Sequence, residues 1–202
     1  SVLSSNVSGT DNTAIGYGAL IPNTASGNTA VGSRALRFNT SGAYNTALGV
    51  DTLRSNTTAS NNTAVGYQAG YSNTTGAVNT LLGYQAGYSN STSNGNVFVG
   101  QGAGYSTTGN NNTIIGTAAG YSLTTGAGNT FVGPNNSTNG SGYAMTTGSN
   151  NTILGGYNGN QGGLDIRTAS NYIVLSDGAG NPRGIFDGSG NLLVGRTSSS
   201  GT

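Results

Sequence analysis

The most regular feature of this chain is a short phrase in which Asn and Thr precede two apolar residues and a glycine. The phrase begins at Asn12 and recurs at positions 28, 45, 62, 79, 96, 112, 129 and 151. In the copy that begins at Asn96, Val97 replaces Thr. Successive copies are 16 or 17 residues apart, except for a last step of 22. Such self-similarity is typical of a stacked array of repeats and not of a globule around one central core.

Each copy reads as a small β-structured unit. Residues 62–76 have the sequence Asn-Thr-Ala-Val-Gly-Tyr-Gln-Ala-Gly-Tyr-Ser-Asn-Thr-Thr-Gly, in which two short segments are separated by Gly and followed by a polar loop. No helical period is present, and glycine at this density opposes helices. We therefore predict an all-β fold over residues 1–160, a parallel β-roll or β-solenoid whose 16–17-residue coils each hold two short strands and two turns.

Two neighbouring positions of the phrase are apolar in every copy. The fourth position is always Ile, Val or Leu, from Ile15 to Leu154, and is predicted to face the interior of the coil. The third position points to the opposite face of the strand, and a strand that is apolar on both faces is buried on both. One coil has room for one narrow interior, so the third position is predicted to contact other copies of the chain in a homotrimer around a thin apolar axis. The candidate interface residues are Leu81, Phe98, Ile114, Phe131 and Ile153.

A monomeric solenoid whose third-position alanines face water is the alternative to this trimer.

Other columns of the repeat are expected to have structural roles in a monomer and in a trimer. Small residues from Ala19 to Ala119 are expected where two walls of the coil approach each other, and the position after them is Leu in three copies and then Gly in four. Glycine there predicts a left-handed backbone or a close approach. The Asn that opens each phrase is predicted to form an amide ladder between coils.

Tyrosines occur in two columns, one at the tenth position of the repeat and one at the sixth. Stacked rings on a neutral, hydroxyl-rich surface could dock sugar rings, and in the alternative they pack over turns or between protomers and stabilise the stack. The candidate glycan or surface contacts are Tyr67, Tyr71, Tyr84, Tyr88, Tyr105 and Tyr121.

Residues 161–202 lack the repeat and are predicted to form a second unit, a short β-meander. Three apolar runs, beginning near Tyr172, Arg183 and Leu192, are separated by Asp-Gly turns at Asp177 and Asp187. Asp-Gly between apolar runs is a strong hairpin signal.

The charge and residue types exclude most chemistry. All six basic residues are Arg, all five acidic residues are Asp, and His, Cys, Lys and Glu are absent from the 202 residues. The net charge of +1 leaves no footprint for nucleic acid, and no apolar run is long enough for membrane insertion. Triads and His- or Cys-based metal sites are impossible, and Asp177 and Asp187 fall in turns where Asp is expected for backbone reasons. We therefore expect no enzyme, cofactor or metal, although an Asp pair or a calcium loop at these turns remains an alternative.

The repeat resembles the head repeats of trimeric autotransporter adhesins. That family repeats Asn-Ser-Val-Ala-Ile-Gly, and residues 61–66 and 111–116 of this chain match it in register. The resemblance covers residues 12–157 and implies a left-handed parallel β-roll in a trimer. Thr replaces the Val that is frequent in the family, the Gly-Tyr-Gln-Ala-Gly-Tyr segment is longer, and this sequence contains neither stalk nor anchor.

The C-terminal segment resembles a different group of proteins. Residues 190–198, Gly-Asn-Leu-Leu-Val-Gly-Arg-Thr-Ser, look like the region of phage tail fibres and tailspikes that precedes an intramolecular chaperone. In that family the chaperone guides trimerisation and is often removed. The chain begins with Ser1 and not Met, so we expect a fragment or a processed product.

Together the two resemblances imply a non-enzymatic phage tail fibre on the virion, which binds other virion tail proteins and a host surface glycan or protein. The first alternative is an adhesin head on a bacterial cell surface. An enzymatic tailspike is another alternative. A further one is a monomeric ice-binding solenoid, which would need the Thr column to point outward. That column shares a face with the fourth position, which is expected to be interior, and this argues against ice binding. That column contains Thr13, Thr29, Thr46, Thr63 and Thr80.

Overall fold

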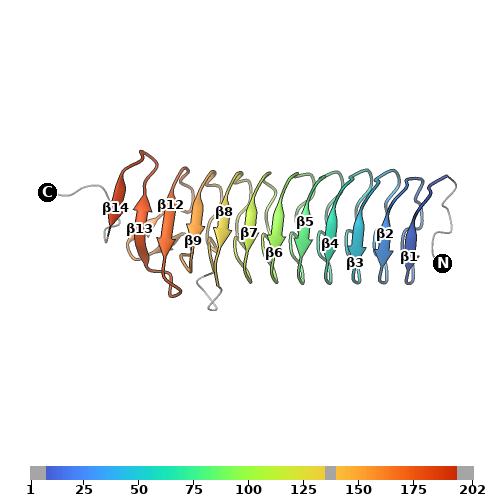
Figure 1. Cartoon of the computed structure of the whole chain (residues 1–202), viewed down its shortest axis with the longest axis horizontal. Helices are drawn as coiled ribbons and strands as arrows, with labels where there is room; N and C mark the ends of the chain where they lie inside the picture. Colours follow the sequence, from blue (N-terminus) through green and yellow to red (C-terminus); the bar gives the residue numbers. More distant parts are fainter. Residues whose placement is uncertain (1–7, 135–139, 195–202) are drawn as a thin grey trace.

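The computed structural model describes residues 8–134 and 140–194, and this part of the chain is all-β and contains no helix. About nine coils stack into an elongated parallel β-solenoid, as Figure 1 shows. Each coil contributes one three-residue strand: β1 (Thr13–Ile15), β2 (Thr29–Val31), β3 (Thr46–Leu48), β4 (Thr63–Val65), β5 (Thr80–Leu82), β6 (Val97–Val99), β7 (Thr113–Ile115), β8 (Thr130–Val132) and β9 (Thr152–Leu154).

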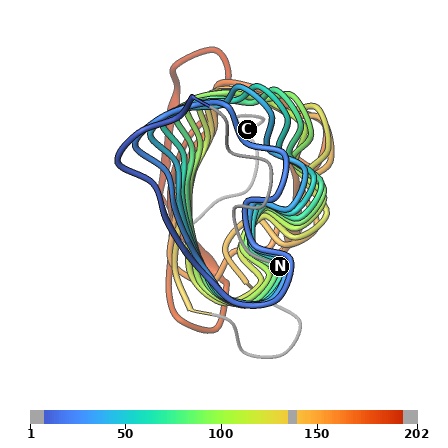
Figure 2. The ribbon, with the colours of Figure 1, turned by 90° about the vertical axis from the view of Figure 1, so that its right-hand side faces the viewer.

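The strands pair in parallel so that identical repeat positions lie side by side. Thr63 aligns with Thr80, and the same register holds from β1 through β9. Viewed down the stack, the coils superimpose around one closed outline (Figure 2). The expected parallel β-solenoid of 16–17-residue coils is therefore confirmed.

The prediction of two strands per coil is wrong for the second segment. Residues around Ala69 and Gly70 form turns, although the coils remain hydrogen-bonded there through Gly70 N and Ala86 O at 2.9 Å. The physical reason is a left-handed backbone: φ is 55° at Gln68 and 61° at Gly70, and left-handed residues at alternate positions interrupt an extended strand.

The assignment of the two apolar faces is also wrong, and the structure reverses it. The third position points into the coil: Leu81, Phe98, Ile114, Phe131 and Ile153 are all completely buried within the single chain. These five residues contact the chain's own core and are not available to a partner chain. The fourth position instead faces outward, because successive side chains of a strand point to opposite faces. The sequence pattern alone could not distinguish the directions, since both positions are apolar.

The interior is filled by residues that compensate for one another across the coil. In the early coils small third-position residues such as Ala47 accompany a large residue such as Leu53 on the opposite wall, and both are fully buried. In later coils this opposite wall has Gly, and the third position becomes large. A Cβ added to Gly104 would lie 2.8 Å from the Phe98 ring, so glycine is required by close approach as well as by its φ of 58°.

Buried asparagines form ladders that join the coils. The predicted ladder at the start of the phrase is confirmed: Oδ1 of Asn28 accepts hydrogen bonds from the backbone N and Nδ2 of Asn45 at 3.0 and 3.1 Å. A second ladder, which sequence reasoning missed, includes Nδ2 of Asn56 donating to Oδ1 of Asn39 at 2.7 Å. These side-chain amides pair with one another and with buried backbone groups, as buried polar groups require.

The C-terminal residues continue the solenoid sheet before turning back. β12 (Ile173–Ser176) pairs in parallel with β9, and β13 (Pro182–Phe186) and β14 (Leu192–Val194) follow as antiparallel strands. The predicted three-stranded meander is thus present, and it is hydrogen-bonded directly to the repeats. A short hairpin of β10 (Asn160–Gln161) and β11 (Leu164–Asp165) was not predicted. Residues 195–198 of the tail-fibre-like segment lie outside the described residues.

Candidate functional surfaces

The outer face of the long sheet is a narrow strip with two columns of side chains. One column holds the fourth-position aliphatics, of which Ile15 is 60% exposed and Val65 37% exposed. The other holds the Thr of each phrase, which is exposed or half-buried, as at Thr63 and Thr80. Sequence reasoning placed both columns inside, so the existence of this strip follows from the tertiary structure.

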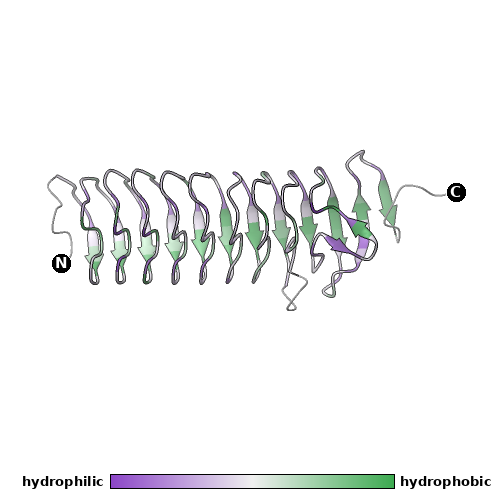
Figure 3. Cartoon of the chain, turned by 180° about the vertical axis from the view of Figure 1, so that it is seen from behind, coloured by the Kyte–Doolittle hydropathy of each residue, from purple (hydrophilic) through white to green (hydrophobic). Residues whose placement is uncertain are grey.

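The strip becomes wholly apolar towards the C-terminus. Ile173 takes the place of Thr152 in the register, Phe186 lies next to Ile173, and Leu192 lies next to Phe186. Leu192 and Val194 are 57% and 71% exposed. In Figure 3 the ribbon of β14, at the C-terminal end of the sheet, is green. A contiguous exposed apolar surface of this kind is typical of an interaction site.

The tenth-position tyrosines form a continuous stack along the solenoid. Ring centroids of Tyr71, Tyr88, Tyr105, Tyr121 and Tyr143 are separated in succession by 5.1, 5.0, 4.8 and 5.5 Å, and the rings lie within 15° of parallel. The spacing matches the separation of neighbouring parallel strands, so the coil repeat itself positions the rings. Burial, and then the neighbouring tyrosines, raise the pKa of Tyr105. Tyr143 extends the column beyond the residues that the sequence indicated.

Arginines take over this column at its N-terminal end. The Arg54 guanidinium lies 5.3 Å from the Tyr71 ring centroid and donates a hydrogen bond of 2.6 Å to the Tyr71 hydroxyl. The same guanidinium lies 5.2 Å from the Phe38 ring, and it forms an ion pair with Asp51 at 3.4 Å. Asp51 also accepts two hydrogen bonds from Arg34, at 2.7 and 2.6 Å. These contacts cap the aromatic stack with positive charge placed over ring faces.

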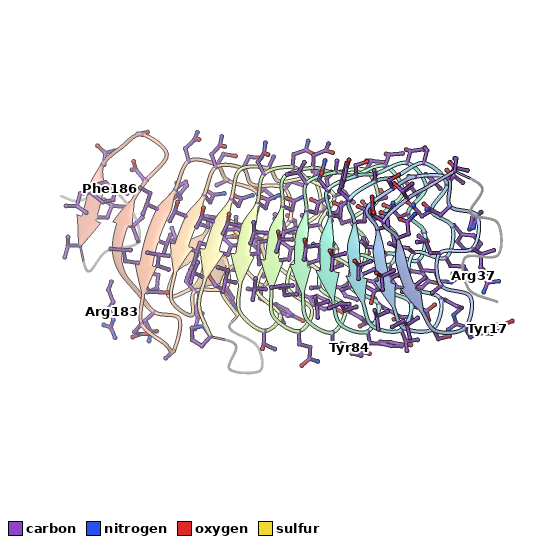
Figure 4. The ribbon with its side chains drawn as sticks, turned by 45° about the vertical axis from the view of Figure 1, so that its right-hand side comes forward. Tyr17, Arg37, Tyr84, Arg183 and Phe186 are labelled. Carbon is purple, nitrogen blue, oxygen red and sulfur yellow. The ribbon has the colours of Figure 1, made fainter. Side chains whose placement is uncertain are left out.

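The sixth-position column contains a shorter stack, in which Tyr67 and Tyr84 are 5.5 Å apart. Figure 4 places Tyr17 and Tyr84 at the edge of the stack beyond the carboxyl ends of the strands. Beside this column, Gln85 Nε2 donates to Gln68 Oε1 at 2.8 Å. Where the column passes from Tyr84 to Gln101, a pocket of about 260 Å³ opens and reaches Tyr121 of the other column.

The two Asp-Gly loops are turns stabilised by the Asp side chains. Asp177 Oδ1 accepts hydrogen bonds from the backbone N of Ala179 and Asn181 at 3.0 and 2.9 Å, and Asp187 does the same with Ser189 and Asn191, both at 2.9 Å. The backbone bond from Asn181, followed by Arg183, lowers the pKa of Asp177, and the side chain of Asn191 lowers that of Asp187. The carboxylates thus serve the turns, as the sequence predicted.

The charged residues near β11 line a second pocket. Arg167 donates to Asp165 at 2.9 and 2.7 Å, and these groups border a space of about 340 Å³ with Thr146 and Thr168. The ion pair lowers the pKa of Asp165 and raises that of Arg167. Within residues 8–134 and 140–194, no group of three His, Cys, Asp or Glu side chains could hold a metal ion.

No protein-family model, curated protein or solved structure matches this chain. In the described part of the chain, no helix is long and apolar enough to cross a membrane.

Proposed function

We propose that this chain is a structural and receptor-binding segment of a homotrimeric fibre, namely a bacteriophage tail fibre that attaches the virion to the host cell. The observation that carries the proposal is the outward apolar strip, which runs from Ile15 through Leu154 and continues to Val194. A lone chain exposes this strip to water, whereas association of copies would bury it.

The shape of the strip supports a small number of copies around one axis. Each solenoid strand is only three residues long, so the outer face is two side chains wide over β1–β9. Three such strips can meet along one thin axis, each contacting both neighbours. The number three follows the resemblance to trimeric head repeats, and the apolar residues at the axis would be those of the fourth position in place of the third.

The mass in solution tests the assembly. Sedimentation equilibrium of the purified chain is expected to give three times the 19.9 kDa of one chain. Val65→Asp would place an unpaired carboxylate in the buried strip and should dissociate the trimer. Thr75→Asp is the matched control, because Thr75 is exposed in the loop that follows the strand of Val65; this variant should leave the mass unchanged. A 19.9 kDa species for the parent chain would reject the trimer.

The virion assignment needs a separate test. Antibody labelling of purified phage particles in the electron microscope should mark fibres that project from the tail. Labelling of a bacterial cell envelope, together with a neighbouring gene for a membrane β-barrel, would favour the alternative of a bacterial surface adhesin head.

A second candidate function, ice binding by a single solenoid, gains support from the reversed faces. The Thr column is expected inside from the sequence, but Thr63 is exposed and Thr80 half-buried on the outer strip. Successive Thr and aliphatic side chains lie about 4.8 Å apart along the stack and form a regular array that could order water. Thermal hysteresis in a monomeric sample that Thr63→Tyr abolishes would favour this function. Absence of hysteresis would exclude it.

A further inference from the structure

We infer that the pocket between Tyr84 and Tyr121 binds one pyranose ring of an uncharged glycan. This inference rests on the receptor-binding part of the proposed function and names its ligand class and location. It does not depend on how many chains the fibre contains.

The pocket exists because the sixth and seventh positions change to smaller side chains after the coil of Tyr84 and Gln85. The sixth position changes from Tyr84 to Gln101 and then to Thr117, and the seventh changes from Gln85 to Gly102. The wall of Tyr and Gln side chains that covers the preceding coils therefore ends at Tyr84 and Gln85. The space that opens is about 260 Å³, below the roughly 300–1,000 Å³ of drug-sized sites, which favours one ring-sized unit.

Aromatic rings border the pocket at opposite ends. Tyr67 stacks on one face of Tyr84 at 5.5 Å with 20° between the rings, so the other face of Tyr84 is directed towards the coil of Gln101. At the opposite end Tyr121 is held by ring neighbours on both sides, at 4.8 Å from Tyr105 and 5.5 Å from Tyr143. The second face of Tyr84 is therefore preorganised to contact the C–H groups of a sugar without a large loss of side-chain freedom. Tyr121 borders the pocket with its ring edge, because Tyr105 and Tyr143 cover its two faces.

The polar groups and the charge of the pocket select the type of sugar. Gln85, Gln101 and Thr117 supply amide and hydroxyl groups that can bind sugar hydroxyls. No ionisable carboxylate, ammonium or guanidinium occurs between Arg54 and Asp165 in the sequence. An acidic sugar would therefore find no cation to pair with its carboxylate, and a neutral pyranose is the better match.

The pocket can be filled with a residue that the repeat already tolerates. Gly102 has a φ of 62°, and Gln occupies the same position at Gln68 and Gln85 with φ of 55° and 54°. A Cβ added to Gly102 lies 3.4 Å from Tyr121, an ordinary contact. Gly102→Gln should therefore fill the pocket and extend the Gln ladder while leaving the fold intact. Gly18→Gln, at the same position in the first coil, is the matched control.

Titration of the full chain with methyl glycosides of glucose, galactose, mannose and N-acetylglucosamine, followed by NMR, tests the inference. At least one should shift the amide signals of Gln101, Gly102 and Ala118 saturably, and Gly102→Gln should abolish the shifts. Tyr84→Ala should weaken binding about three- to tenfold, from the loss of one ring contact. Gly18→Gln and Tyr17→Ala should change the affinity less than twofold.

Three results would overturn the inference: no saturable binding of any of the four glycosides, binding that Gly102→Gln leaves intact, or stronger binding of the methyl glycoside of N-acetylneuraminic acid. If the chain sediments as a trimer but binds no sugar, the sugar-binding inference is rejected and the proposed fibre is retained. If the chain sediments as a monomer and binds a sugar, the proposed trimeric fibre is rejected and the sugar site is retained.

Discussion

At the scale of single residues, the coil depends on backbone conformations that most side chains avoid. Gly66 has a φ of 127°, and a Cβ there would lie 2.5 Å from the Gly83 carbonyl oxygen of the next coil. The residue before the opening Asn of each phrase is also left-handed, and there the repeat uses Gly, Asn and several other residues. The constancy of glycine at the fifth position of the phrase, where Gly66 lies, predicts a special backbone conformation there. The left-handed conformation before the opening Asn was visible only in the structure, because several residue types occur at that position.

Val78 is a residue whose replacement should stabilise the protein. Its φ of 61° is unfavourable for a β-branched side chain, whereas Asn61 and Asn111 adopt φ of 61° and 58° at the same repeat position. Val78 is mostly exposed, so little packing is lost. Val78→Asn should raise the free energy of unfolding by about 1 kcal/mol, measured by urea denaturation. The reverse change, Asn61→Val, should lower it by a similar amount, and equal stabilities for Val78→Asn and the parent would refute the strain argument.

The turns at Asp177 and Asp187 should respond to acid. Both carboxyl groups have folded pKa values below the ordinary 3.8, because hydrogen bonds stabilise the carboxylates. As pH falls, the carboxyl groups of the unfolded chain therefore bind protons before those of the folded chain. The contribution of the two carboxylates to the free energy of unfolding is complete above pH 3.8 and is lost as pH falls through the folded pKa values. Carboxyl NMR titration should give an Asp187 pKa under 3.8, and a value at or above 3.8 would contradict this.

At the scale of the coil, the core is defined by pairs of positions rather than by single columns. The sequence showed one column growing as another shrank from Leu to Gly, but it did not show that these two columns meet inside the same coil. The contact between Phe98 and the space above Gly104 explains both trends together. In the coil where both positions are small, Ala64 and Gly70, the side chains of Leu53 and Leu81 from the neighbouring coils fill the space at Gly70, because protein interiors are close-packed.

A double-mutant cycle should reveal this pairing. Phe98→Ala should lower stability by about 3–5 kcal/mol through a cavity. Gly104→Leu should cost about 1–3 kcal/mol through overpacking. The double variant reproduces the Ala47 and Leu53 pattern of an early coil, so it should be more stable than the sum predicts, with a coupling of about 2 kcal/mol in thermal or urea unfolding. Additive losses would indicate that the two residues do not share one space.

At the scale of the whole molecule, the proposed association through the outward strip would couple folding to assembly. If copies bury this strip, unfolding must also separate them, and the apparent stability then depends on protein concentration. The melting temperature of the parent chain should rise over a hundredfold increase in concentration. The Val65→Asp variant should melt at a lower temperature that does not change with concentration. A melting temperature of the parent chain that is independent of concentration would show that the strip remains exposed.

The sequence by itself determined the period, the in-register parallel stack, the amide ladder that begins each phrase and the C-terminal meander. These features follow from local spacing, from identical residues meeting across neighbouring coils and from Asp-Gly turns, all of which are visible along the chain. The direction of each apolar column was decided only by the tertiary structure. Leu81 and Leu82 are equally apolar neighbours, and the pleat requires only that they point to opposite faces. Which of them faces inward depends on how left-handed residues elsewhere in the coil close the chain. The pocket beside Tyr84 likewise depends on closure, because the sixth and tenth positions approach each other only when the coil is complete.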